Sequence, residues 1–251
     1  PRNAGHGRVA GTAAEGLSSG MTIVSHRHRF IFLKTEKTAG TSIEIALSKF
    51  CGGDDVISRI AAEDEPLRRS LGYPGPQHIG VAPVSTYRGR DWWNLVRKGR
   101  RKPLFYNHMP ATEVRRLVGD EVWNGSFKFC FERNPWDRMV SMYYWQNRTE
   151  PRPTLDDYLP LGIESLRRRG YLQYTIDGVV AVDRVCRFED LAGELEVVRG
   201  ITGLPEPLAL PRAKGGHRVD RRHYREILTA SQRRRIEDAF ADEIRLMRYE
   251  F

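Results

Sequence analysis

The feature that most constrains the fold is an apolar run followed by a short loop and then a helical segment. Residues 29–34, Arg-Phe-Ile-Phe-Leu-Lys, have the short apolar centre typical of a strand that is buried on both faces. Residues 35–42 are mostly small or polar, and apolar residues then recur at helical spacing over 43–50. A strand that leads through such a loop into a helix is a repeating unit of parallel α/β folds.

Further strands and helices alternate along the rest of the chain. We expect strands over 104–106, 127–131 and 183–188, and helices over 109–118, 135–146, 189–199 and 231–247. Asn134 and Pro135 are typical of an N-cap residue and a first helical residue. The sequence therefore predicts an α/β fold, specifically a P-loop-like three-layer α/β/α arrangement around a central parallel sheet.

The length of 251 residues suits one α/β domain with a substantial core. Residues 1–20 are rich in Gly, Ala and Ser, and we expect a flexible tail there, followed by a single domain over 21–251. No apolar run approaches the roughly 20 residues that span a bilayer, and no signal-like apolar segment is present near the start. A cytoplasmic protein is therefore expected.

Charge and cysteine usage narrow the possible partners only partly. The net charge of +9 attracts polyanions, which include nucleic acid, anionic lipid, acidic glycans and nucleotide phosphates. The cysteines Cys51, Cys130 and Cys186 match no zinc spacing, and their odd number argues against a disulfide framework. We expect them to be buried, reduced thiols in a reducing compartment.

The loop between the first strand and its helix has the composition of a phosphate-binding loop. Backbone N–H groups and the helix dipole favour an anion at a helix N-terminus. Gly40 permits close approach to the backbone, Lys37 supplies a mobile charge, and hydroxyls come from Thr38, Thr41 and Ser42. The alternative is an ordinary strand-to-helix turn with a surface lysine.

A second candidate site lies where the strand over 127–131 meets the next helix. Arg133 stands at this junction, and ligands of parallel sheets bind at the carboxyl ends of strands. An arginine can hold a phosphate through two parallel hydrogen bonds, and the Ser141 hydroxyl on the following helix could share that phosphate. The alternative is that Arg133 pairs with a nearby acid such as Asp137.

These two segments together resemble a known family. Lys37–Ser42 and Phe127–Tyr143 are similar to the two motifs of the sulfotransferase superfamily that bind 3′-phosphoadenosine 5′-phosphosulfate (PAPS), and are closest to its carbohydrate-type, family 2-like branch. The resemblance covers about residues 29–251, with a gap over 51–103. It extends to shorter matches at His108–Ala111, Arg187–Leu191, Leu210–Pro211, Tyr224–Glu226 and Tyr249–Phe251.

The resemblance implies transfer of a sulfuryl group from PAPS to an acceptor hydroxyl, with no metal. Lys37 would stabilise the leaving phosphate. Arg133 and Ser141 would bind the 3′-phosphate, and Lys214 would belong to a late loop that covers the cofactor. The 5′-phosphate would be held by the loop residues Lys37, Thr38, Ala39, Gly40, Thr41 and Ser42.

The acceptor and the base are less constrained. The branch implies a glycan or a small hydroxylated molecule as the acceptor, with 51–103 as an acceptor-side insertion, and leaves O- or N-sulfation open. His108 is the first candidate for the base because it follows a predicted strand at the same sheet edge and titrates near neutral pH. A capping or packing histidine is the alternative. Glu36 stands where the family often has proline, and Glu132 where it often has an apolar residue. Both are reserve bases.

Two other functional classes fit parts of the sequence. A P-loop-like kinase or hydrolase needs the order Gly-Lys-Ser/Thr, which this loop lacks. A basic nucleic-acid-binding module is supported by the net charge but by no named motif, so we expect no specific nucleic acid. We expect Trp92 and Trp93 to lie in the core, with stacking on a sugar or aryl acceptor as the alternative.

Overall fold

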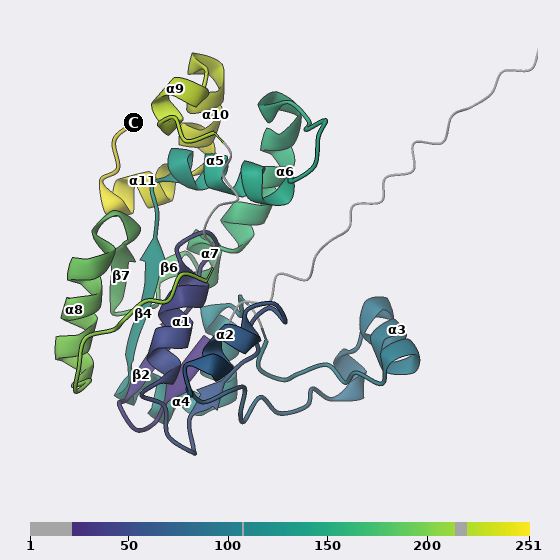
Figure 1. The fold of residues 1–251 in the computed structure, drawn as a ribbon, viewed down its shortest axis with the longest axis vertical. Helices are drawn as coiled ribbons and strands as arrows, with labels where there is room; N and C mark the ends of the chain where they lie inside the picture. Colours follow the sequence, from purple (N-terminus) through teal and green to yellow (C-terminus); the bar gives the residue numbers. More distant parts are fainter. Residues whose placement is uncertain (1–21, 107, 214–219) are drawn as a thin grey trace, which may run out of the picture.

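The computed structural model describes residues 22–106, 108–213 and 220–251. The predicted tail over 1–20 and Lys214 lie outside the described residues. A five-stranded sheet forms the centre, in the order β3-β1-β2-β4-β7 (Figure 1). Its strands are β1 (Thr22–Ser25), β2 (Phe30–Leu33), β3 (Val56–Ile57), β4 (Phe127–Glu132) and β7 (Arg184–Arg187).

The sheet is mixed, so the expectation of a parallel sheet is wrong in one respect. Strands β2, β4 and β7 run parallel, but β1 is antiparallel to both of its neighbours, β2 and β3. Only the residues from His26 to Arg29 connect β1 to β2. A connection this short can join antiparallel strands only, because a parallel pair needs a crossover of a dozen or more residues.

Helices cover both faces of the sheet because its side chains alternate between two cores. On one face, Phe32 and Phe129 share a hydrophobic cluster with residues of α1 (Gly40–Ser48) and α8 (Leu191–Thr202). On the other face, Ile31 and Cys130 belong to a cluster that includes residues of α4 (Ala111–Gly125) and α7 (Tyr171–Tyr174). This places α/β/α layers around the parallel strands.

A second group of helices lies beyond the carboxyl ends of β2 and β4, at the top of Figure 1. A hydrophobic cluster around Trp136 and Met139 joins them. The predicted helix over 231–247 is in fact two helices, because the backbone leaves helical geometry at the buried Phe240. The group consists of α5 (Pro135–Gln146), α6 (Leu155–Arg168), α9 (Tyr224–Ile227), α10 (Ala230–Ala239) and α11 (Ala241–Met247).

Local signals predicted some elements closely and others not at all. Helix α5 has the expected bounds, and the Asn134 side chain caps it by accepting hydrogen bonds from the amides of Trp136 and Asp137. The strand expected over 104–106 is absent. The amides of Leu104 and Phe105 donate instead to the Ile79 carbonyl, so this segment pairs with a neighbouring loop and not with the sheet.

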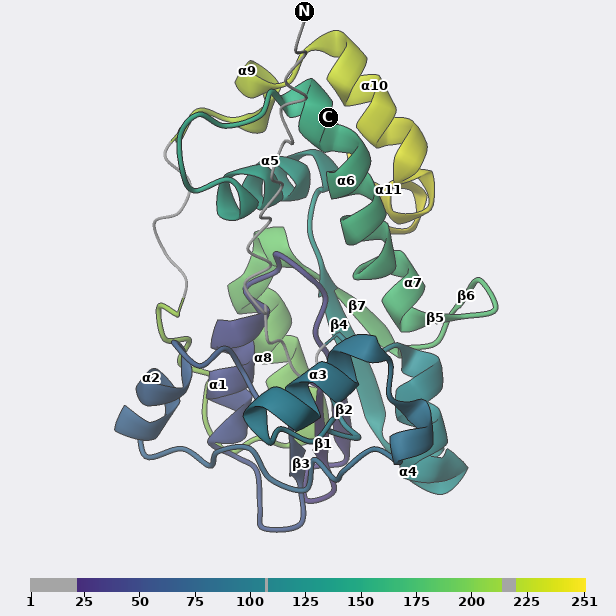
Figure 2. The same ribbon diagram turned by 90° about the vertical axis from the view of Figure 1, so that its right-hand side faces the viewer.

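The segment 51–103 contains β3, α2 (Glu65–Ser70), the 3₁₀ helix η1 (Val84–Thr86) and α3 (Gly89–Lys98). Helix α3 stands away from the sheet in Figure 1 and lies toward the viewer in Figure 2. Trp92 and Trp93 are 47% and 51% exposed, so the expectation that they lie in the core is wrong.

The three cysteines are free and buried, as expected, and burial raises the pKa of each thiol. A small hairpin of β5 (Thr175–Ile176) and β6 (Val179–Val180) completes the strands of the described residues. Among the described residues, no helix is both long enough and apolar enough to cross a bilayer.

Candidate active site

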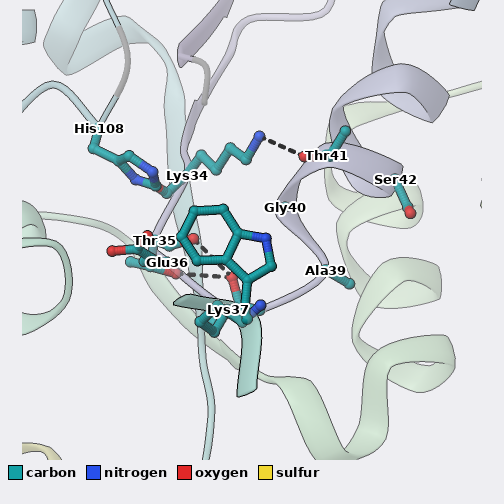
Figure 3. A pocket seen from close by; sticks show the side chains of 11 residues that line it. Lys34, Thr35, Glu36, Lys37, Ala39, Gly40, Thr41, Ser42 and His108 are labelled. Atoms are coloured by element: carbon teal, nitrogen blue, oxygen red, sulfur yellow. Dashed lines mark hydrogen bonds between the residues drawn. The ribbon is translucent and has the colours of Figure 1, made fainter. Parts of the chain in front are cut away.

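A pocket opens where β2 passes into α1 (Figure 3). Its wall is the loop that the sequence singled out, together with one residue from the segment before α4 and one from α5. The lining residues are Lys34, Thr35, Glu36, Lys37, Thr38, Ala39, Gly40, Thr41, Ser42, His108 and Trp145. The structure therefore brings the predicted phosphate loop and the predicted base into one pocket.

The backbone of the loop is held in an uncommon conformation. Lys37 and Ala39 have φ angles of 66° and 58°, which fall in the left-handed region that residues other than glycine rarely adopt. Thr38 braces the turn, since its hydroxyl lies 3.0 Å from the Thr35 hydroxyl and donates to the Thr35 carbonyl at 3.1 Å. The Thr35 hydroxyl donates in turn to the Phe131 carbonyl, which ties the loop to β4. Such strain persists only where the surroundings hold it, and it is common at functional sites.

Lys34 is a pocket residue that the sequence analysis missed. Its ammonium group donates to the Thr41 hydroxyl at 2.9 Å and to Glu44 at 3.0 Å. A Cβ atom on Gly40 would lie 2.5 Å from Cγ of Lys34, so this glycine makes room for the lysine stem. The need for glycine here comes from the chain itself, whereas the sequence argument assigned it to an approaching phosphate.

The Lys34–Glu44 ion pair is almost fully enclosed, with side chains that are 6% and 0% exposed. Burial raises the pKa of the Glu44 carboxyl to about 7, against the opposing effect of the Lys34 ammonium. Oε1 of Glu44 has no hydrogen-bond partner among the described residues. Lys34 is therefore a buried cation at the N-terminal end of α1, next to the predicted phosphate loop.

Trp145 is the pocket residue that α5 contributes. The Lys37 ammonium lies 5.1 Å from the centre of the Trp145 ring, within the range of a cation–π contact. Trp145 is on the last turn of α5, 108 residues beyond Lys37 in the sequence, and no local pattern indicated that its ring would reach the loop. Only the fold shows that Trp145 comes near the loop, because α5 begins at the end of β4, which adjoins the loop.

Arg133 connects the two predicted phosphate-binding segments. Its Nη1 atom donates to the Lys37 carbonyl at 3.0 Å and to the Ser141 hydroxyl at 3.4 Å. Its Nε and Nη2 atoms both donate to Oδ2 of Asp137, at 3.0 and 2.6 Å, and its guanidinium lies 4.3 Å from the Phe188 ring centre. The pairing with Asp137 and the proximity to Ser141 are thus both present.

The two reserve bases are held in ion pairs. Glu132 is completely buried and accepts from Nη1 of Arg138 at 2.6 Å and from the Tyr174 hydroxyl at 3.0 Å. Glu36 accepts from the Arg169 guanidinium at 3.2 Å. The Glu36 amide also donates to the Arg169 carbonyl at 3.0 Å, a bond that proline could not form.

His108 enters the pocket from the chain that precedes α4, in a left-handed conformation with φ 49°. Its Nδ1 lies 2.8 Å from the Lys34 carbonyl oxygen, which can only accept. In the neutral ring Nδ1 therefore carries the proton, and Nε2 keeps the lone pair. Burial lowers the pKa of His108 to about 4. The ring is therefore neutral at pH 7 with the lone pair of Nε2 present, and it is a weaker base than an exposed imidazole.

The remaining candidates have separate outcomes. The Ser42 hydroxyl accepts from the Ala213 amide at 3.4 Å, which brings the chain before the predicted late loop to the start of α1. Lys214 itself lies outside the described residues. Another histidine, His78, bonds to the Gly53 carbonyl through Nε2 at 2.6 Å and is not part of the pocket wall.

Chemically, the pocket combines cations, a helix N-terminus and a neutral imidazole. Lys34, Lys37 and Arg133 lie on or beside one loop, where an anion with several negative charges would be stabilised. Within the described ranges, no three His, Cys, Asp or Glu side chains are arranged to hold a metal ion. Such a site can bind an anionic group and accept a proton from a neighbouring hydroxyl.

Comparisons with known proteins lead to the same family as the motifs. The model of the family described as "Sulfotransferase family" matches residues 21–169, more than half of the chain. An uncharacterized protein of Archaeoglobus fulgidus is 32% identical over 104 residues, which are 40% of this chain and 87% of that protein. No solved structure matches the chain. The resemblance seen in the sequence is confirmed, and the chain belongs to the sulfotransferase family.

Proposed function

We propose that this protein transfers a sulfuryl group from PAPS to an acceptor hydroxyl by in-line displacement. Family membership supports sulfotransferase activity in general. The observation that carries the specific proposal is the contact of Arg133 Nη1 with the Lys37 carbonyl at 3.0 Å. It joins two segments that lie 96 residues apart, each of which is suited to one phosphate of a doubly phosphorylated nucleotide.

The donor would lie across this junction. The 3′-phosphate would contact the Arg133 guanidinium and the Ser141 hydroxyl, while loop residues 37–42 would hold the 5′-phosphosulfate. Lys214 keeps its proposed place in a loop over the donor. Arg133 donates to Asp137 with Nε and Nη2 and to the Lys37 carbonyl with one hydrogen of Nη1. We assign to the phosphate the other hydrogen of Nη1, which faces the Ser141 hydroxyl at the long distance of 3.4 Å.

The reaction forms one sulfur–oxygen bond and breaks another. The acceptor oxygen bonds to sulfur as the bond from sulfur to the 5′-phosphate oxygen breaks. His108 Nε2 takes the proton of the hydroxyl, which is possible because Nδ1 is held at the Lys34 carbonyl. The Lys37 ammonium stabilises the negative charge that develops on the leaving phosphate.

The acceptor that we propose is a glycan or a similar small hydroxylated molecule, and 51–103 is the segment proposed to approach it. Glu36 and Glu132 are weaker candidates for the base, because each is already paired with an arginine. The kinase and nucleic-acid alternatives are not favoured, since the family match points to sulfuryl transfer.

The test is thermal unfolding with adenosine 3′,5′-bisphosphate, the product nucleotide, compared with AMP and ATP. At ~100 times its dissociation constant, the bisphosphate should add about 2.7 kcal/mol to the free energy of unfolding. Arg133→Ala should abolish this gain. Arg245→Ala, a control at an arginine whose side chain is 78% exposed on α11, should retain it. Equal or greater stabilisation by ATP with magnesium would overturn the proposal.

Turnover separates donor binding from the chemical step. With PAPS and a panel of hydroxylated acceptors, His108→Asn should keep the bisphosphate-induced stabilisation but lose activity by roughly 10²–10⁴-fold, the usual contribution of a positioned base. Lys37→Met should behave in the same way if the lysine acts on the leaving group. Full activity of His108→Asn would remove this residue from the mechanism.

A further inference from the structure

Helix α3 presents an apolar face to solvent at the tip of a projecting arm, which we define as residues 80–104. At 100° per residue, Leu95, Trp92, Val96 and Trp93 fall within an arc of about 160°. An amphipathic helix usually turns such a face toward a core. No residue of α3 is buried, however, and Val96, near the centre of the arc, is 79% exposed.

The arm is a defined structure despite its exposure. The Tyr87 ring contacts the Trp92 ring edge-on at 5.6 Å, and the Tyr87 hydroxyl accepts from the Lys102 amide at 3.0 Å. Asp91 caps the start of α3 by accepting from the Arg88 amide at 3.0 Å. The Ala82 amide donates to the Lys102 carbonyl at 2.9 Å, which closes the base of the arm. The apolar face is therefore presented by a folded unit.

The arm also carries most of the net charge of the chain. Residues 88–102 contain seven Arg or Lys residues against the single acid Asp91, a net charge of +6 out of the chain's +9. Lys98 lies over the Trp93 ring, 4.8 Å from its centre, so cation and apolar surface adjoin. The polar side of α3 and the loop after it hold the remaining cations, among them Arg97, Arg100 and Arg101.

We propose that α3 is an interfacial helix that binds the surface of an anionic lipid bilayer, with its Trp and aliphatic face between the headgroups and its cations at the phosphates. This inference is independent of the proposed reaction. Helices that lie in the membrane interface separate an apolar face sharply from a basic one while remaining polar on balance, and α3 has both properties. Trp prefers this depth, and basic side chains gain attraction from anionic headgroups.

The composition of the face favours a bilayer over other polyanions. Glycans and nucleic acids can stack on the tryptophans, but they offer nothing to bury Leu95 and the exposed Val96. Two copies of the arm meeting face to face would bring two net charges of +6 together, at an electrostatic cost. An anionic bilayer supplies both the apolar layer and the opposite charge.

The test is flotation of the full chain with vesicles of phosphatidylcholine alone or with about one-third phosphatidylserine. We expect binding to the anionic vesicles only, decreasing as salt rises because the charges are exposed. Val96→Asp should lower the partition coefficient by at least tenfold. Arg100→Ser and Arg101→Ser should each lower it roughly fivefold, as expected for one basic residue at the surface.

The matched control is Val179→Asp in the β5–β6 hairpin, where the valine is 69% exposed and lies outside the arm. It adds the same charge and should leave vesicle binding unchanged. Equal binding of Val96→Asp and parent would overturn the proposal, as would equal binding to neutral vesicles. Absence of vesicle binding together with a dimer that Val96→Asp abolishes would also overturn it, in favour of self-association.

Discussion

The pocket loop and the arm differ in which side chains they bury and which they expose. In the loop, polar and charged groups point inward and bond to one another, as with Lys34 and Thr41, or Thr35 and Thr38. In the arm, apolar groups are turned outward and cations surround them. Buried polar groups must be satisfied to avoid a large desolvation cost, so the loop is fixed from within. The arm is left with a face that only an external surface can cover.

The largest effect should come from breaking the inner network at Arg138. This arginine is almost fully buried and joins Glu132 to the carbonyls of Glu36 and Arg169. Arg138→Ala leaves the Glu132 carboxylate enclosed without its cation, and we expect the free energy of unfolding to fall by about 3–5 kcal/mol. Urea denaturation measures this change.

The matched change in the arm is Lys102→Ala, which removes the 3.5 Å pairing with Asp91. Both side chains are about a quarter exposed, so the loss should stay below about 1 kcal/mol. Equal losses for Arg138→Ala and Lys102→Ala would break the contrast between the two regions.

The second effect concerns pH and His108. Because burial lowers the pKa of His108 to about 4, from an ordinary value of 6.5, the unfolded chain binds this proton more readily than the folded one. Stability from this residue is therefore complete above pH 6.5 and is lost as pH falls toward 4, by on the order of 3 kcal/mol. Asn tolerates the left-handed backbone at this position. His108→Asn should therefore make the free energy of unfolding depend less on pH between 6.5 and about 4.

The control for that profile is His78→Asn. His78 has nearly the same backbone conformation, with φ 52°, but its ring is exposed and bonds to the Gly53 carbonyl. Its replacement should leave the parent profile unchanged. If His108→Asn also follows the parent curve between about pH 4 and 6.5, the histidine is not held neutral by its surroundings.

The smallest effect compares two glycines. Gly40→Ala should cost about 1–3 kcal/mol, because the new Cβ would overlap the Lys34 stem in a packed site. It should also weaken bisphosphate binding. Gly89→Ala, at the first position of α3, meets no atom within 4 Å and should be neutral or stabilise by up to about 1 kcal/mol. Thermal unfolding of both variants measures the difference, and a neutral Gly40→Ala would show that Lys34 can move aside.

The sequence predicted those parts of the structure that depend on neighbours in the chain. The start of α5 is one example, since Asn134 and Pro135 are local signals that act wherever they occur. Arg133 and the loop over 37–42 followed from the same strand-to-helix pattern. The antiparallel β1 was missed because four residues between two short apolar runs gave no clear hairpin signal.

Other features depend on packing between distant segments. Lys34 and Trp145 enter the pocket only because β2, α1 and α5 meet there. Trp92 and Trp93 were expected in the core because large aromatic residues are usually well buried, but composition does not show which elements α3 packs against. The sequence also did not show that Gly40 leaves space for the stem of Lys34, because that contact depends on how β2 and α1 pack. The expected role of Gly40 toward a phosphate stays a prediction.

The bracing of the loop by its own side chains has a thermodynamic consequence. Residues 35–42 are held by Thr35, Thr38, Arg133 and Arg138, which reach into β4, α5 and the end of α6. Fixing one residue costs roughly 1–2 kcal/mol of conformational entropy. Here the loop is already ordered when the chain folds, so little binding free energy is lost to ordering it when a ligand enters. The ligand binds to a preorganised site.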